Sequence, residues 1–185
     1  MKNQTKNQMT DKITDQIIEN KVNLEDPFPY VTDRKPLEKA EIIYRTTWKS
    51  YPIYIKSVMG LYPTAYIDVK CSDIVENYDC ASFRLKHKKF EKNAPFEITY
   101  ADKHLAISNK MGCQGETLKG NFIGWDYAHC FDYNAMMPDW AGKKHTIAEI
   151  VKDATDFIDN NLIPTVEEIH DERNSNRIAK KASRG

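Results

Sequence analysis

The feature that most constrains the fold is a series of short segments, between residues 40 and 127, that alternate apolar and polar side chains. In residues 64–69, for example, Ala65, Ile67 and Val69 occupy every second position. This spacing is typical of a strand with one buried face. Further β-rich segments lie at residues 42–48, 51–58, 96–100, 104–107 and 121–127. The gaps are too short for helical crossovers, so we expect about five strands in a mostly antiparallel sheet.

Two stretches between these segments are predicted to be irregular. Asp102 and Lys103 are expected to form a turn, and residues 111–120, which hold three glycines, are expected to form a loop.

The last third of the chain predicts helices. Residues 146–149 have the capping-box sequence Thr-x-x-Glu, and apolar side chains recur from 147 to 162 at three- and four-residue spacing. The asparagine pair at 160–161 and Pro164 predict the end of this helix, and Thr165 predicts the start of a second one. Together with the strands, this pattern predicts an α+β fold whose C-terminal helices pack on one face of the sheet.

With 185 residues, the chain has the length of one domain. We expect a single domain, 1–185, in which residues 1–36 form a peripheral N-terminal arm with a short helix, 40–135 the strand-rich core, and 145–180 the C-terminal helices. No segment is apolar enough to cross a bilayer, and the polar N-terminus lacks a signal-peptide core. We therefore expect a cytoplasmic protein.

Charge is balanced overall but uneven along the chain. Lys and Arg number 27, as do Asp and Glu, which argues against a uniformly basic nucleic-acid-binding protein. Residues 84–92 carry five positive side chains against one negative, the pattern of a solvated strand edge or a phosphate contact. Residues 139–172 carry nine acidic side chains against three basic ones. This stripe is either an ordinary solvated helix face or a partner-binding surface, formed by Glu149, Asp153, Asp156 and Asp159.

One short stretch concentrates residues that can bind a metal ion. Zn²⁺ accepts imidazole, thiolate and carboxylate ligands. The candidate ligands are Asp126, His129, Cys130 and Asp132, with Cys113, Glu97 or His104 as a ligand from elsewhere in the chain. Because side chains on an extended strand point to alternate faces, His129 joins the aspartates only if the chain turns near Ala128. We therefore predict a structural zinc site here.

Other interpretations of the same residues stay open. Asp126 can cap the local backbone beside a hydrogen-bonded His129, and Asp126 and Asp132 can form an acid–base pair. Cys113 or Cys130 can serve as a nucleophile with His129 as base. Cys71 and Cys80 are expected to be small, partly buried apolar residues.

The segment that holds this cluster resembles a widespread family of small proteins encoded by phages, prophages and plasmids. Those proteins carry a strand of the form Trp-x-Gly-Phe-Asp-x-Ala-His-x-x-Asp, which matches residues 124–129 and Asp132. Ile98-Thr99-Tyr100 matches an earlier strand of the family, and Thr146, Glu149 and Val151 match its helix. The resemblance covers residues 45–162. It departs from the family at residues 95–97, Pro-Phe-Glu, where family members often carry a histidine.

The resemblance implies an anti-defence role. In size and character the chain looks like a type II-A anti-CRISPR protein. Such a protein would inhibit a host CRISPR nuclease by stoichiometric binding, and Cas9 is the first candidate. The zinc would then hold the last strand and the following loop together. The alternative is a metal-dependent hydrolase that acts on a nucleotide or nucleic acid, with an open metal position and a pocket beside His129.

Overall fold

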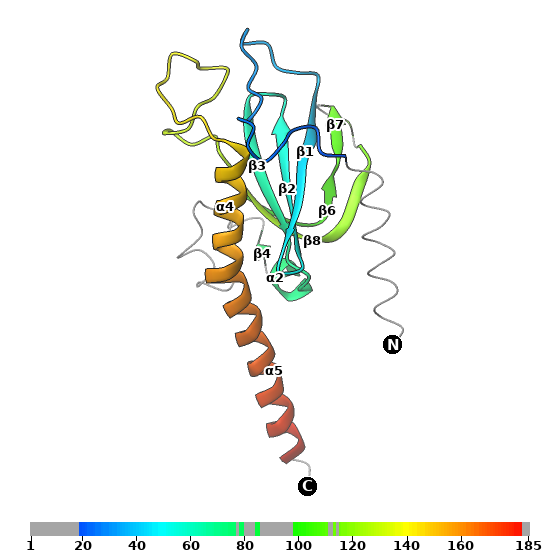
Figure 1. The fold of residues 1–185 in the computed structure, drawn as a ribbon. Coiled ribbons are helices and arrows are strands. Elements are labelled where there is room, and N and C mark those ends of the chain that lie inside the picture. The colour runs from blue at the N-terminus through cyan, green and yellow to red at the C-terminus, as the bar shows by residue number, and fades with distance from the viewer. Residues whose placement is uncertain are drawn as a thin grey trace.

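A computed structural model describes residues 19–76, 78–79, 84–85, 98–110, 113 and 115–182. The fold is α+β: a curled antiparallel sheet with one long C-terminal helix against it (Figure 1). The predicted N-terminal helix and the basic stretch 84–92 lie largely outside the described residues, and Cys80 and Glu97 lie wholly outside them. Within the described ranges, no helix is both long and apolar enough to span a membrane.

The main sheet has six strands in the spatial order β6-β8-β3-β2-β1-β7, every neighbouring pair antiparallel. Its strands are β1(Lys39–Trp48), β2(Tyr51–Val58), β3(Tyr62–Asp68), β6(Tyr100–Ala106), β7(Ser108–Lys110) and β8(Thr117–Asp126). Beside it lie the short helix α2(Ser72–Glu76) and a two-stranded ribbon of β4(Tyr78–Asp79) and β5(Arg84–Leu85). The antiparallel architecture agrees with the prediction, but the main sheet has six strands rather than about five.

The stretches predicted as a turn and a loop contain strand residues. Asp102 and Lys103 lie inside β6, where the pairing with β8 shifts register between Asp102 and His104. The Asp102 carboxylate accepts a hydrogen bond from the backbone N–H of His104 at 2.9 Å, so the side chain supports a bulge where a turn was predicted. Residues 117–120 begin β8.

Because the sheet is curled, its two edge strands, β6 and β7, meet at Ile107. Ile107 separates β6, at one edge, from β7, at the other. Its N–H donates to the Glu116 carbonyl and its carbonyl accepts from the N–H of Ile42, both at 2.8 Å. Lys56 on the central strand β2 reaches this junction, where its ammonium donates to the Ala106 carbonyl and the Asn109 side chain. Burial lowers the pKa of Lys56 to about 8.

The core lies between the sheet and the C-terminal helix, because the apolar faces of both turn inward. Its principal members are Ile53, Ile55, Ala65, Ile67, Ile123 and Trp125 from the sheet, and Ile147, Ile150, Ala154 and Phe157 from the helix. Phe28, from the stretch predicted as a peripheral arm, is 2% exposed and belongs to the same core. The chain around residue 28 is therefore fixed to the body of the protein.

The C-terminal helix is continuous, where two helices were predicted. It comprises α4(Ile147–Phe157), the π-helical turn η1(Ile158–Leu162) and α5(Ile163–Ala182). In η1 the N–H of Ile163 bonds to the carbonyl of Ile158, five residues back. This wider turn directly precedes Pro164, whose ring would clash with the carbonyl four residues earlier in a regular helix. The helix therefore passes the proline, and α5 extends beyond the sheet (Figure 1).

Candidate functional site: the loop after β8

The structure separates the predicted ligand Asp126 from the other members of its cluster. One carboxylate oxygen of Asp126 accepts from the Thr99 hydroxyl, and the other accepts from the backbone N–H of Ala128, both at 3.1 Å. Asp126 therefore ties the end of β8 to the chain before β6 and starts the turn that follows. This is the geometry expected of a residue that caps the backbone.

His129 and Asp132 lie together in the turn after β8. Asp132 is 7% exposed, and its Oδ2 accepts from the backbone N–H of His129 at 3.1 Å. The same oxygen lies 3.4 Å from the Nδ1 of His129, whose side chain is 39% exposed. The chain thus turns after Ala128, which is the condition that the sequence set for bringing these two residues to one place.

Sequence reasoning missed His145, which completes the buried centre of this site. Its Nε2 lies 2.8 Å from Asp132 Oδ1, and the residue is 3% exposed. Because an ionised carboxylate can only accept, Nε2 carries the shared hydrogen. Nδ1 is buried and has no hydrogen-bond partner among the described residues. The pair spans thirteen residues and has no sequence signature; the position of His145 directly before the helix cap was its only signal.

A second buried chain of hydrogen bonds joins this centre to the helix. The Trp125 indole N–H donates to the Tyr127 hydroxyl at 3.2 Å, and that hydroxyl donates to Asp153 at 3.1 Å. The Tyr127 ring packs on the His145 ring with centroids 4.5 Å apart. Burial raises the pKa values of both Tyr127 and Asp153. Asp153, predicted to contact a partner, thus accepts a hydrogen bond from within the protein.

The other three carboxylates of the predicted acidic stripe also have partners within the chain. Glu149 forms the capping box with Thr146 and pairs with Lys143 at 3.1 Å. Asp156 pairs with Lys152 one helical turn away. Asp159 accepts from the Trp48 indole at 2.9 Å, which lowers the pKa of Asp159, as does Lys49 at 3.0 Å.

The loop that these contacts fix carries an exposed apolar cluster. Phe131 is 83% exposed, Met137 57%, Trp140 54% and Met136 49%. Figure 1 shows the loop, in yellow, projecting beyond the N-terminal end of α4. Between these residues the loop is anchored by Ala135, which is 1% exposed and whose N–H donates to the Leu61 carbonyl at 3.2 Å. We call residues Phe131, Met136, Met137 and Trp140 the apolar loop cluster.

The predicted cysteine ligands lie in different places. Cys130 and His129 line a cavity of about 180 Å³ inside the loop, together with Asp132 and Trp140. Cys113 and His104 instead line a cavity of about 540 Å³ beside β6. Across the described parts of the chain, no three His, Cys, Asp or Glu side chains gather as a ligand set for a metal ion. Of the predicted ligands, the structure brings His129 and Asp132 into contact.

In comparisons with known proteins, no family model, no curated protein and no solved structure matches this chain.

Proposed function

We propose that this protein is an anti-defence inhibitor that acts by stoichiometric binding to a CRISPR nuclease, with Cas9 as the first candidate. The apolar loop cluster is the observation that carries the binding function. Four large apolar side chains exposed within residues 131–140 are unfavourable in water and typical of a surface that a protein partner covers. The choice of target rests on the phage, prophage and plasmid setting of the family that residues 45–162 resemble.

The loop is suited to binding because its conformation is fixed before a partner arrives. One carboxylate oxygen of Asp132 accepts from the His129 backbone N–H, and the other bonds to the His145 ring. Both Asp132 and His145 are buried. The backbone also forms a bridge between Asp132 and Lys143, which closes the loop at its base. A preformed surface loses less conformational entropy on binding, so more of the contact energy appears as affinity.

The test is binding and inhibition with purified Cas9 loaded with guide RNA. The double variant Phe131→Ser/Met136→Ser should weaken Cas9 binding about tenfold and relieve the inhibition of DNA cleavage. Truncation of central apolar contacts has effects of this size. Ile178→Ser is the matched control, since Ile178 is 69% exposed but lies far along α5. Titration by calorimetry gives both affinity and stoichiometry.

Four outcomes would contradict parts of the proposal. Absence of binding to Cas9 would rule out Cas9 as the target. Unchanged binding by the Phe131/Met136 variant, or an equal loss in the Ile178 control, removes the apolar loop cluster as the surface. If Asp156→Lys alone abolished binding, the acidic stripe would be the binding surface, because the Asp156 side chain is 54% exposed on the helix.

A zinc ion remains part of the proposal only as a structural element. Asp126, His129 and Asp132 do not form one ligand set in this geometry, because Asp126 is bound to Thr99 and Ala128. Elemental analysis of the purified protein, with melting curves in the presence and absence of chelator, decides the matter. About one zinc per chain, with a lower melting temperature after chelation, would establish a structural site.

The second candidate is the metal-dependent hydrolase, favoured by the cavity beside His129 and Asp132. At about 180 Å³, that cavity is smaller than the roughly 300–1,000 Å³ of typical ligand sites. The hydrolase requires that His129→Ala abolish nucleotide turnover while the fold persists. The binding function requires that the same variant keep its inhibition of the nuclease wherever it remains folded.

A further inference from the structure

The apolar loop cluster combines a projecting aromatic side chain with a hollow in the same loop. Phe131 is 83% exposed, more than any other large apolar side chain that the structure describes. The hollow is the cavity of about 180 Å³, whose described wall comes from residues 128–140 and includes Ala128, Met137 and Trp140. We call this cavity the loop socket. Phe131 is not part of its described wall, so the socket of its own chain does not shelter the Phe131 ring.

The size and the wall of the loop socket match a phenyl ring. An apolar cavity of about 150 Å³ holds a molecule of benzene. The socket is slightly larger, at about 180 Å³, and its wall is mostly apolar. A ring that enters it leaves water and contacts the Met137 thioether and the Trp140 indole. Both groups pack favourably against aromatic rings.

The polar groups of the wall already have partners within the chain. Both carboxylate oxygens of Asp132 take part in the hydrogen bonds described above. The side-chain oxygen of Asn134 accepts from the Met136 N–H at 2.9 Å. The Trp140 indole N–H donates to the Cys130 carbonyl at 2.5 Å, which fixes the indole in the wall. An apolar occupant therefore leaves these hydrogen bonds intact.

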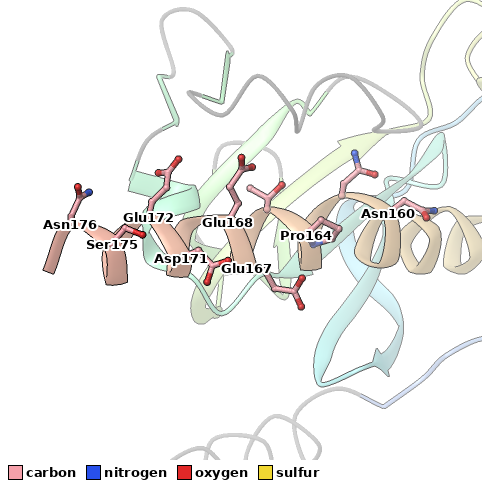
Figure 2. Close-up of a pocket in the computed structure, with 10 residues that line it drawn as sticks. Asn160, Pro164, Glu167, Glu168, Asp171, Glu172, Ser175 and Asn176 are labelled. Atoms are coloured by element: carbon pink, nitrogen blue, oxygen red, sulfur yellow. The ribbon is translucent and has the colours of Figure 1, made fainter. Parts of the chain in front are cut away.

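Two other described cavities suit an aromatic ring less well. The cavity of about 540 Å³ beside β6 includes Asp102, His104 and Asn109 in its lining. The cavity of about 900 Å³ along η1 and α5 carries four carboxylates in its described lining, shown in Figure 2: Glu167, Glu168, Asp171 and Glu172. Charged and polar groups lose hydration when an apolar ring covers them, which costs free energy. The loop socket is therefore the best match for Phe131 among the three.

A surface that carries both an exposed ring and a socket of the right size is complementary to itself. In a twofold-symmetric pair, each contact between two residues occurs twice, once in each direction. We propose that two copies of this chain associate through the apolar loop cluster, with Phe131 of each copy seated in the loop socket of the other. The association removes from water the most exposed large apolar side chain of the described residues.

This association is expected to be weak and reversible. Stable interfaces bury about 800 Å² on each partner, whereas a whole Phe or Trp side chain supplies about 150–250 Å². The four members of the apolar loop cluster are each partly covered already. One consequence rests on the proposed function: the pair occupies the surface that would bind the nuclease. The single chain is then the inhibitory form, and pairing regulates how much of that surface is free.

The test is sedimentation of the full-length protein over a wide range of concentrations. Reductant is present throughout, because Cys130 is exposed and its free thiol can form a disulfide between copies. We expect the mean mass to rise with concentration towards that of two chains. Phe131→Ser should weaken the association about tenfold. Ile178→Ser, the control outside the loop, should leave it unchanged, although Ile178 is 69% exposed.

Ala128→Leu fills the loop socket without removing any apolar side chain. It should weaken the association about tenfold, because the Phe131 ring of the other copy loses its site. Non-specific association of apolar surfaces would instead be unchanged or strengthened by an added leucine. Ala141→Leu is the matched control, since Ala141 is an exposed residue of the same loop that is not part of the described wall. Melting curves check that each variant is folded.

A mixture of the two variants tests whether the contact is reciprocal. Neither Phe131→Ser nor Ala128→Leu can form the contact with a second copy of itself. A mixed pair retains one contact, because Phe131 of the Ala128→Leu copy meets the open socket of the Phe131→Ser copy. At equal total concentration, the mixture should therefore associate more strongly than either variant alone.

Several results would overturn the proposal. A wild type that stays a single chain at every concentration overturns it and leaves Cas9 binding to its own test. Equal loss in Ala141→Leu or Ile178→Ser, or a mixture no stronger than its components, overturns the fit of ring and socket. Association only in the absence of reductant would be a disulfide and would also overturn it. Pairing by a protein that does not bind Cas9 would confirm the association and overturn only its regulatory consequence.

Discussion

The loop after β8 and the outer half of α5 both reach into solvent, but they are held in opposite ways. The loop has irregular backbone, and buried side chains below it, Asp132 and His145, fix its turns. From His170 to Lys180 every side chain of α5 is exposed, and the backbone keeps the regular hydrogen bonds of a helix. The loop presents four large apolar side chains, whereas α5 presents mostly charged and polar ones.

The difference shows what each kind of exposed surface needs from the rest of the protein. An exposed apolar cluster without support would collapse onto the body or aggregate, so its backbone must be fixed from within. A charged helix remains soluble and keeps its shape through local hydrogen bonds, so it tolerates the absence of packing. Stability and surface function are therefore coupled in the loop and nearly independent in α5.

The largest expected effect comes from Asp132→Ala, which tests the coupling between stability and the loop surface. It removes the acceptor of both the His129 backbone N–H and the His145 ring, and so leaves two donors unpaired. At about 1–3 kcal/mol for each, we expect a loss of about 3 kcal/mol in the free energy of unfolding. Urea denaturation measures the loss. Hydrogen exchange should increase in residues 128–145 and stay unchanged in residues 170–182.

The matched control is Asp139→Ala, in the same loop, because the Asp139 side chain is 90% exposed and pairs only at the surface with Arg34. It should change the free energy of unfolding by less than about 0.5 kcal/mol. If both variants lose equal stability, the buried pair does not determine the fold of the loop.

Gly142→Ala deforms the loop without removing any polar group. A Cβ atom at Gly142 would lie 2.1 Å from the Asp132 carbonyl oxygen and 2.5 Å from the Tyr133 nitrogen, distances that force the backbone to move. We expect a loss of about 2 kcal/mol, within the range for overpacked sites. Weaker Cas9 binding should accompany it, and Ala141→Ser next to it should affect neither property. Full binding by Gly142→Ala would show that the surface does not depend on loop geometry.

Thr146→Ala acts where the loop meets the helix. The Thr146 hydroxyl accepts from the backbone N–H of Glu149 at 3.2 Å, and Glu149 accepts from the Thr146 N–H at 2.9 Å. Loss of such a cap costs about 1 kcal/mol. Thermal unfolding should show this loss, and Thr155→Ala, in the last turn of α4, should not. An unchanged midpoint for Thr146→Ala would mean that the loop, and not the cap, sets the start of α4.

The pH dependence of Glu149 provides a smaller effect. Hydrogen bonding to the Thr146 backbone, with a further contribution from Lys143, lowers the pKa of Glu149 below its usual 4.5. The folded state therefore binds fewer protons here than the unfolded state, so the contribution of Glu149 is complete above pH 4.5 and disappears as pH falls through the folded pKa. The stability difference between wild type and Glu149→Gln should shrink below pH 4.5. A constant difference from pH 7 to 3 would contradict this assignment.

The same contrast explains which features the sequence predicted. Local patterns specified the regular parts: the alternation in 64–69 lies in β3, and the Thr146–Glu149 capping box begins α4. Features that depend on distant contacts were missed. Pro164 looked like a helix end because nothing local shows that a π-helical turn accommodates it. The metal hypothesis grouped Asp126 with His129 and Asp132, but Thr99 binds Asp126, and His145, distant in sequence, pairs with Asp132.

The smallest expected effect comes from deletion of residues 177–185. Arg177, Ile178 and Lys180 are exposed. Because the deletion removes no described side chain from the core, the free energy of unfolding should change by less than about 0.5 kcal/mol. Calorimetry measures the change, and a fall of several degrees in the melting temperature would show that the end of α5 is covered in solution. In that case α5 would depend on packing as the loop does, and the contrast between the two regions would fail.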